Sequence, residues 1–124
     1  MSLPIPSLKY VVKYFNRENL IQKVIEQIKK DFNWFSYNII LEGKEITPYL
    51  ELFHQILPII DDLLNDNYTK LLSLLYRIDI EEDFLNKKLK ENQHADTAEI
   101  ITDLIIKRAL QKVIIREMYN KSIK

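Results

Sequence analysis

The chain has 124 residues, of which 47% are hydrophobic and 29% are charged. These shares are close to the averages of globular proteins and disfavour a disordered or membrane-spanning class, and the length fits one domain over residues 1–124. Lysine and arginine together number 18, as do aspartate and glutamate, so the net charge of zero gives no overall attraction to nucleic acid or anionic lipid.

Two residue types are missing or almost missing, and each excludes a class of chemistry. The sequence has no cysteine, which excludes disulfides, thiolate zinc sites and cysteine nucleophiles. Its single glycine, Gly43, excludes the glycine-rich phosphate loops of P-loop and Rossmann enzymes. No secretory signal pattern opens the chain, and no apolar stretch approaches the ~20 residues of a membrane helix. We expect a cytoplasmic, non-enzymatic protein without a cofactor.

Residues 17–32 carry the first clear helical pattern, which Asn16 can cap. The apolar residues that recur there at helical spacing are Leu20, Ile21, Val24, Ile25, Ile28 and Phe32. Residues 8–15 fit a short helix or an extended arm, because tyrosine and valine favour strands, and we favour the helix. We expect residues 1–6 and 121–124 to be frayed, as chain ends often are.

The next segment, residues 34–41, is as aromatic and β-branched as a strand. A lone strand would leave its backbone without partners, so we predict a helix that ends at Gly43. Thr47 followed by Pro48 predicts the start of another helix, because proline is preset for the first helical position. Pro58 falls inside that helix and should kink it.

Polar residues that can accept backbone hydrogen bonds mark two further helix starts. Asp66 or Asn67 can cap the run that follows them, which is apolar around most of its circumference, as in a buried helix. Asp79 and Glu82 have the spacing of a capping box and predict the start of the next helix. Arg77 would then pair with Asp79 or with open carbonyls. A ligand site at this segment is the alternative.

Asp96 and Glu99 repeat the capping pattern and start the last helix, predicted over residues 97–120, which is apolar on two sides. One side carries Ile100, Ile101, Leu104, Ile105, Ile115, Met118 and Tyr119, and the other carries Ile106, Leu110, Val113 and Ile114. This helix is either the central rod of the domain, or its second side, with Arg108 and Arg116 at the rim, packs on a copy of itself; both can hold together. We predict a compact all-α bundle of five or six helices with this helix at its centre.

Two functional hypotheses follow from the last helix. The first is a protein-interaction or structural module that associates with itself as a homodimer. The second is a nucleic-acid binder, because cations cluster late in the chain and near its start and can track phosphates. These cations are Lys107, Arg108, Lys112, Arg116, Lys121, Lys124, Lys9, Lys13 and Arg17. Alternatively, the late cations pair with the acidic residues of the middle segment, which are Glu42, Glu45, Glu51, Asp61, Asp62 and Asp66.

Both histidines follow a glutamate by three positions, as Glu51 with His54 and Glu91 with His94. This spacing resembles the ligand pattern of ferritin-like di-iron carboxylate proteins over these eight positions, which implies a metal-binding helical bundle as the third hypothesis. That family also uses two further inward glutamates, whereas Glu26 projects to the polar side of its helix. Because Glu51 also projects away from the apolar face, we assign no metal ligand.

Overall fold

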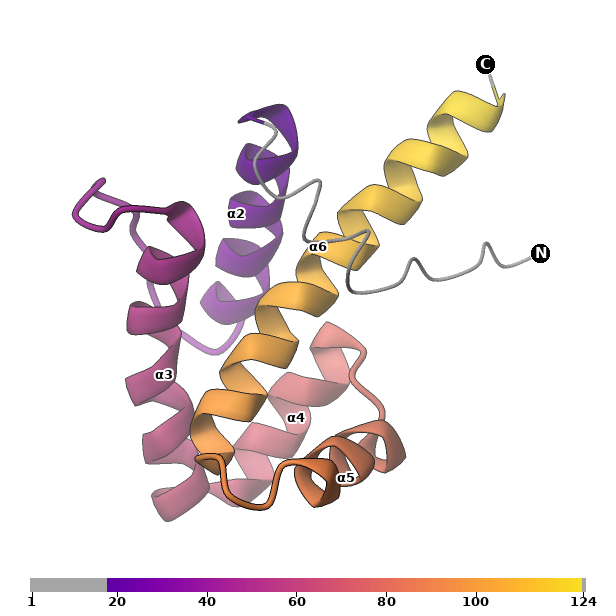
Figure 1. Ribbon diagram of the computed structural model, residues 1–124. Helices are drawn as coiled ribbons and strands as arrows, with labels where there is room; N and C mark the ends of the chain where they lie inside the picture. Colours follow the sequence, from indigo (N-terminus) through magenta and orange to yellow (C-terminus); the bar gives the residue numbers. More distant parts are fainter. Residues whose placement is uncertain (1–17, 124) are drawn as a thin grey trace.

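Five α-helices and no strand make up residues 18–123, the part of the chain that the computed structural model describes (Figure 1). The helices are α2 (Glu18–Asn33), α3 (Pro48–Asp66), α4 (Tyr68–Ile78), α5 (Glu82–Glu91) and α6 (Thr97–Ile123). The predicted compact all-α bundle with a long C-terminal helix is confirmed. The predictions for residues 1–17, including the Asn16 cap, lie outside the described residues.

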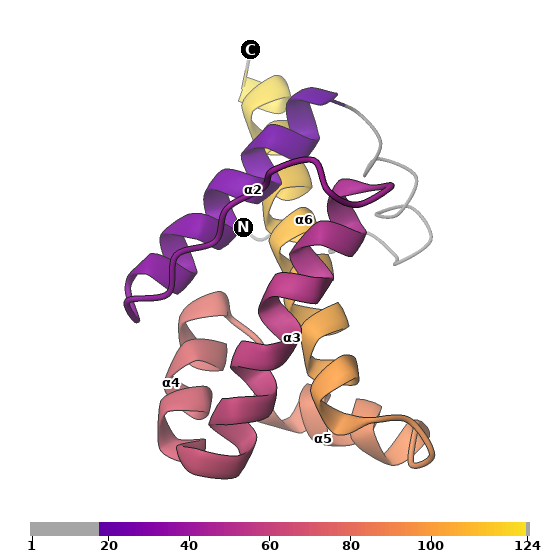
Figure 2. The same ribbon diagram turned by 90° about the vertical axis from the view of Figure 1, so that its left-hand side faces the viewer.

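Helix α6 is the centre of the bundle, and it contacts each of the other four described helices (Figures 1 and 2). Its buried residues are Ala98, Ile101, Thr102, Leu104, Ile105, Ile106, Ala109, Leu110, Val113 and Ile114. They occupy both of the sides that the sequence pattern marked as apolar, so neighbours surround the helix over most of its length. The central-rod prediction is therefore confirmed, and α6 continues to Ile123, beyond the predicted end at residue 120.

Helix α2 ends at Asn33, and the predicted helix over residues 34–41 is wrong. Ser36 adopts a left-handed conformation with φ of 68°. The N–H of Tyr37 donates to the carbonyl of Phe32 at 3.0 Å, and the N–H of Ser36 donates to the carbonyl of Asn33 at 3.0 Å. This pair of bonds is the Schellman motif, which closes a helix and turns the chain away from its axis.

After this turn, residues 37–42 run back along α2 without regular secondary structure (Figure 2). The side chain of Gln55 on α3 makes the two backbone hydrogen bonds that a neighbouring strand would make. Its Oε1 accepts from the N–H of Ile40 at 2.9 Å, and its Nε2 donates to the carbonyl of Ile40. Ile39 is buried in the core. Side chains of α3 thus satisfy the backbone of an extended segment that has no partner strand.

The predicted starts of α3 and α4 are confirmed. Thr47 Oγ1 accepts from the N–H of Leu50 at 3.2 Å, with Pro48 as the first helical residue. Asn67 Oδ1 accepts from the N–H of Lys70 at 3.1 Å and caps α4. Helix α3 is continuous through Pro58, and the kink there stays a prediction. Among the described helices, none combines the length and the apolar character needed to cross a bilayer.

Candidate functional site

The connection between α4 and α5, residues 79–81, is called the joint here. Asp79 has φ of 71° and ψ of 47°, a left-handed conformation. The N–H of Ile80 donates to the carbonyl of Leu75 at 2.9 Å, and the N–H of Asp79 donates to the carbonyl of Tyr76 at 3.1 Å. This is a second Schellman motif, with aspartate at the position that glycine or asparagine usually takes.

Asp79 therefore ends α4, and the predicted capping box of Asp79 and Glu82 is wrong. The cap residue of α5 is Glu81, whose side chain makes no capping hydrogen bond. The other predicted start is confirmed for one of its two residues, because Asp96 Oδ2 accepts from the N–H of Glu99 at 3.3 Å. The side chain of Glu99 accepts no hydrogen bond from the backbone of Asp96 within the described residues, so the second half of the capping box is not formed.

The sequence predicted that Arg77 pairs with Asp79 or with open carbonyls. This prediction is wrong, because Arg77 faces α2. Its Nε lies 3.3 Å from Oδ1 of Asp31, a carboxylate with 4% of its surface exposed. The guanidinium carbon lies 4.5 Å from the ring centroid of Trp34, a cation–π contact. Arg77 thus connects the ends of α2 and α4.

Two cations of α6 instead donate hydrogen bonds to backbone carbonyls at the C-terminal end of α4. Arg108 donates from Nε to the carbonyl of Asp79 at 3.0 Å and from Nη2 to its Oδ2 at 2.8 Å. Lys112 Nζ donates to the carbonyl of Ile78 at 2.9 Å. The last carbonyls of a helix lack partners and carry partial negative charge, which explains why cations gather there. Burial is the main influence that lowers the pKa of Lys112, while the nearby Asp31 carboxylate opposes that shift.

The side of α6 that was predicted to pack on a second copy, called the dimer seam here, is not available for a partner. Ile106, Leu110, Val113 and Ile114 have exposed fractions of 1, 1, 1 and 3% within the single chain. Neighbouring helices of the same molecule already cover them, so in this fold they belong to its core. Of the two residues predicted at the rim, Arg108 reaches the joint, and Arg116 donates to Oε1 of Gln27 on α2 at 2.9 Å.

The late cations whose side chains the structure describes are bound within the molecule. Arg108 and Lys112 hold the end of α4, Arg116 contacts α2, and Lys107 pairs with Asp103 at 2.7 Å. None of these contacts reaches the acidic middle segment that the sequence suggested as their partner. The side chain of Lys121 and residues 9, 13, 17 and 124 lie outside the described part.

The first Glu-x-x-His pair serves a structural role. Glu51 is buried, with an exposed fraction of 7%, and accepts from the backbone N–H groups of Glu42, Gly43 at 3.2 Å and Lys44 at 2.9 Å. The expectation that Glu51 faces away from the molecule is wrong, because the chain before α3 folds over it. His54 is exposed, and its Nδ1 lies 2.6 Å from Oε1 of Glu45.

The second pair lies on the surface. Glu91 and His94 are exposed, and Glu91 lies 3.6 Å from the ammonium of Lys88. No group of three or more potential metal ligands occurs among the described residues. The two pairs are therefore not assembled into the site that the di-iron resemblance implied.

The remaining candidate is an apolar surface around the joint. Two adjoining hollows of about 360 and 320 Å³ share the joint residues in their walls. Their apolar lining is contributed by three helices and the joint, and we call Leu72, Tyr76, Ile80, Phe84 and Leu104 the joint surface. Tyr76 is 87% exposed and Phe84 is 44% exposed. Two aromatic side chains therefore stand in solvent beside hollows with apolar walls.

Charged residues of both signs border the first hollow. Asp79 and Glu81 lie on the joint, and Lys107 and Arg108 lie on α6 across from it. The structure thus brings together two residues that the sequence analysis named separately, Asp79 as a cap and Arg108 as an interface residue. An apolar centre with a charged rim is the common layout of protein–protein interfaces.

Sequence reasoning kept a ligand site at this segment as the alternative but gave Tyr76 and Phe84 no binding role, although a signal was present. The buried stripe of α4 is Leu71, Leu74, Leu75 and Ile78, and the one buried residue of α5 is Leu85. Tyr76 and Phe84 lie off these stripes, and a large aromatic residue away from the core face is a signal for surface contact. A comparison of the chain with protein-family models gave no match, and comparisons with curated proteins and solved structures gave none either.

Proposed function

We propose that this chain is a non-enzymatic protein-interaction module that receives its partner on the joint surface. The observation that carries the proposal is the exposure of Tyr76 and Phe84 beside two apolar hollows. Burying a large apolar side chain stabilises a complex by about 1.5–3 kcal/mol, and tyrosine is enriched among the residues that dominate binding energy. The charged rim would orient the partner.

Other surfaces of the described chain support binding less well. Trp34 is 70% exposed, but it lines neither hollow of the joint surface. Ile46, Tyr68 and Tyr119 are exposed and line neither hollow of the joint surface. A further hollow between α2 and α6 has Val113 as its only apolar lining residue among the described residues, and one on the outer side of α5 has none. The joint surface is where exposed aromatic residues and apolar hollows coincide.

The test is site-specific photo-crosslinking in cells that produce the chain. A photoreactive phenylalanine analogue replaces Phe84 or Tyr76, and the adducts are identified by mass spectrometry. We expect protein adducts at both positions, because both side chains would be covered in the complex. We also propose a cytoplasmic location, which fractionation of the same cells tests by recovering the chain in the cytosolic fraction.

Tyr68 provides the matched control, since it is an aromatic residue of α4 that is 53% exposed but lines neither hollow. The analogue at Tyr68 should give no adduct or a far weaker one. If Phe84 and Tyr76 give no adduct, or if Tyr68 gives the same adduct with the same yield, the joint surface is not the binding site.

A further inference from the structure

Helix α5 is the least embedded of the described helices, and its acidic and basic residues lie at opposite ends. Leu85 is its one buried residue, and its main packing partner is α6. Glu82 and Asp83 lie in its first turn, and Lys88 and Lys90 lie in its last turn. Two copies of such a helix placed antiparallel bring the acidic end of each against the basic end of the other, with their helix dipoles opposed.

Phe84 lies at the centre of a self-complementary stripe on this helix. Glu81 precedes Phe84 by three positions and Lys87 follows it by three, so all three fall on neighbouring positions of one side. Glu81 and Lys87 are exposed, and neither makes an ion pair within the described residues. A two-fold axis near Phe84 would set Glu81 of each copy opposite Lys87 of the other.

The first hollow has the chemistry to receive this stripe. Its lining includes Glu81 and Phe84 of the stripe beside the apolar Ile80 and Leu104, whereas Lys107 and Arg108 are already paired with Asp103 and Asp79. An occupant should therefore offer an apolar residue for the hollow and a cation for Glu81, which makes no ion pair within the described residues. The stripe of α5 does so, and a two-fold arrangement satisfies both copies at once because the same patch serves both sides of the contact.

We infer that the occupant of the joint surface is a second copy of this chain, joined by antiparallel contact of the two α5 helices around Phe84. This inference rests on the proposed function and names its partner. It replaces the α6 seam, whose aliphatic residues lie in the core, by a surface that is exposed in the single chain. The net charge of zero adds no overall repulsion between copies.

Charge reversal tests this geometry with the full-length chain in sedimentation velocity over a range of concentrations. The unmodified protein should approach twice the mass of the chain as its concentration rises. Glu81→Lys sets two lysines opposite each other at both contacts, and Lys87→Glu sets two glutamates opposite each other. Each variant alone should dimerise about tenfold more weakly or worse at low salt, because two ion pairs become two repulsions.

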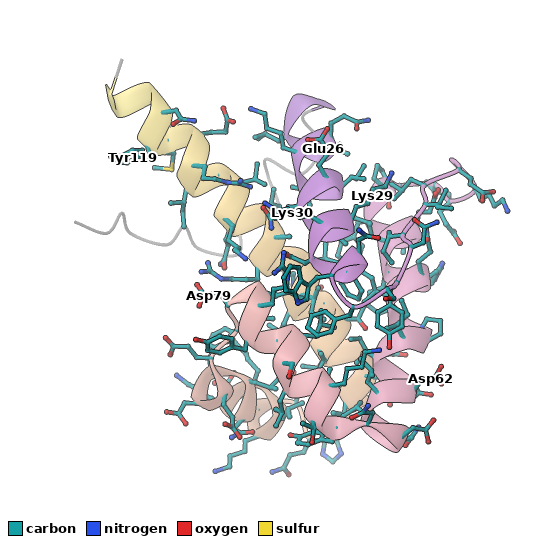
Figure 3. The ribbon with its side chains drawn as sticks, turned by 180° about the vertical axis from the view of Figure 1, so that it is seen from behind. Glu26, Lys29, Lys30, Asp62, Asp79 and Tyr119 are labelled. Carbon is teal, nitrogen blue, oxygen red and sulfur yellow. The ribbon has the colours of Figure 1, made fainter. Side chains whose placement is uncertain are left out.

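Mixing the two variants provides the sharper measurement. A mixed dimer again places lysine opposite glutamate at both contacts, so an equimolar mixture should recover the association that each variant has lost. Glu26→Lys and Lys29→Glu are the matched controls, because both residues are exposed on α2, well away from Asp79 and the joint (Figure 3). These controls should leave the association unchanged, and circular dichroism should show that every variant keeps its helices.

Three results would overturn the inference. They are sedimentation of the unmodified chain as a monomer at every concentration, dimerisation of the single variants as strong as that of the parent, and failure of the mixture to recover association. The first result together with a Phe84 adduct to a different protein would leave the proposed function standing and remove only the second copy. Absence of any Phe84 adduct would remove both.

Discussion

Arg108 of α6 holds Asp79 through both its backbone and its side chain, with Nε 3.0 Å from the carbonyl and Nη2 2.8 Å from Oδ2. The contact joins the central helix to the residue at which α4 ends. Since Asp79 also occupies the left-handed position of the Schellman motif, the contact fixes where the chain turns into α5. The position of the joint surface therefore depends on this pair.

A double-mutant cycle on this pair should reveal a modest coupling. Asp79→Asn keeps a side chain that tolerates the left-handed conformation and removes the charge, and Arg108→Met removes both hydrogen bonds. The coupling should be about 0.5–1 kcal/mol, near the upper end for surface pairs, because most of the Arg108 side chain is covered while Asp79 is largely exposed. Urea unfolding measures it, and strictly additive effects would contradict the predicted coupling.

Leu110→Ala should destabilise the folded chain by about 2–5 kcal/mol, because it opens a cavity in the core. Leu110 is 1% exposed within one molecule, so the loss should not depend on protein concentration. Ile46→Ala is the control, since Ile46 is 92% exposed, and it should change the free energy of unfolding by less than about 0.5 kcal/mol. If the loss of stability in Leu110→Ala grows on dilution, Leu110 lies in a dimer interface and not in the core of one molecule.

The spacing of apolar residues predicted α2, α3, α4 and α6, because these helices bury one or more continuous stripes. It failed over residues 34–41, where composition fits both helix and strand. What decides that segment is a left-handed Ser36 and the side chains of α3, which lie far along the sequence. Local propensity contains neither the Schellman turn at Ser36 nor the tertiary contact with α3.

The candidate site was harder to predict than the fold for a related reason. Asp79 and Arg108 were both noted in the sequence, but their meeting depends on how α6 crosses the end of α4. Apolar character on two sides of α6 is explained equally by a central rod and by a dimer seam, and only the packing of the other helices distinguishes them. Phe84 was given no binding role because a single exposed aromatic residue has no periodicity of its own.

Glu51→Gln should destabilise the chain even though the two side chains have the same shape. The carboxylate accepts three backbone N–H groups with its two oxygens, while glutamine has one acceptor and would turn its own N–H₂ toward a donor. We expect a loss of about 1.5–3 kcal/mol, as for buried hydrogen bonds to a charged group. Urea unfolding gives the loss, and faster amide exchange at Gly43 and Lys44 would locate it.

The control for this substitution is Glu99→Gln, because Glu99 is an exposed residue of α6 with no bond from its side chain within the described part. It should change the free energy of unfolding by less than about 0.5 kcal/mol. An equally small effect at Glu51 would mean that the three N–H groups find other acceptors.

The free energy of unfolding should fall in alkali because of Tyr49. Burial, followed by the hydrogen bond from its hydroxyl to Asp103, raises the pKa of Tyr49 far above its usual value of about 10. Above that value the unfolded chain loses this proton and the folded chain keeps it, so the folded state binds more protons and stability falls as pH rises. The contribution of Tyr49 is fully present below pH ~10.

Urea unfolding at several pH values above 10.5 measures the fall, with Tyr49→Phe as the test variant. This range avoids the opposite contribution of Lys112, whose lowered pKa makes stability rise with pH below the usual lysine value of about 10.4. The variant should show a shallower fall than the parent, and the exposed Tyr68→Phe should not. Identical slopes for parent and Tyr49→Phe would remove Tyr49 as the cause.

Ser36→Gly should stabilise the fold, because Ser36 has φ of 68°, a conformation that costs a residue with a Cβ atom about 1–2 kcal/mol and glycine almost nothing. Glycine also loses more conformational freedom on folding, so the net gain should be about 0.5–1 kcal/mol. Ser73→Gly is the matched control, since Ser73 is an exposed residue inside α4, where the same substitution should destabilise by up to about 1 kcal/mol. Opposite signs at the two serines, measured by urea unfolding, would locate the gain in the Schellman motif. A loss at Ser36 would show that the turn after α2 does not need its left-handed residue.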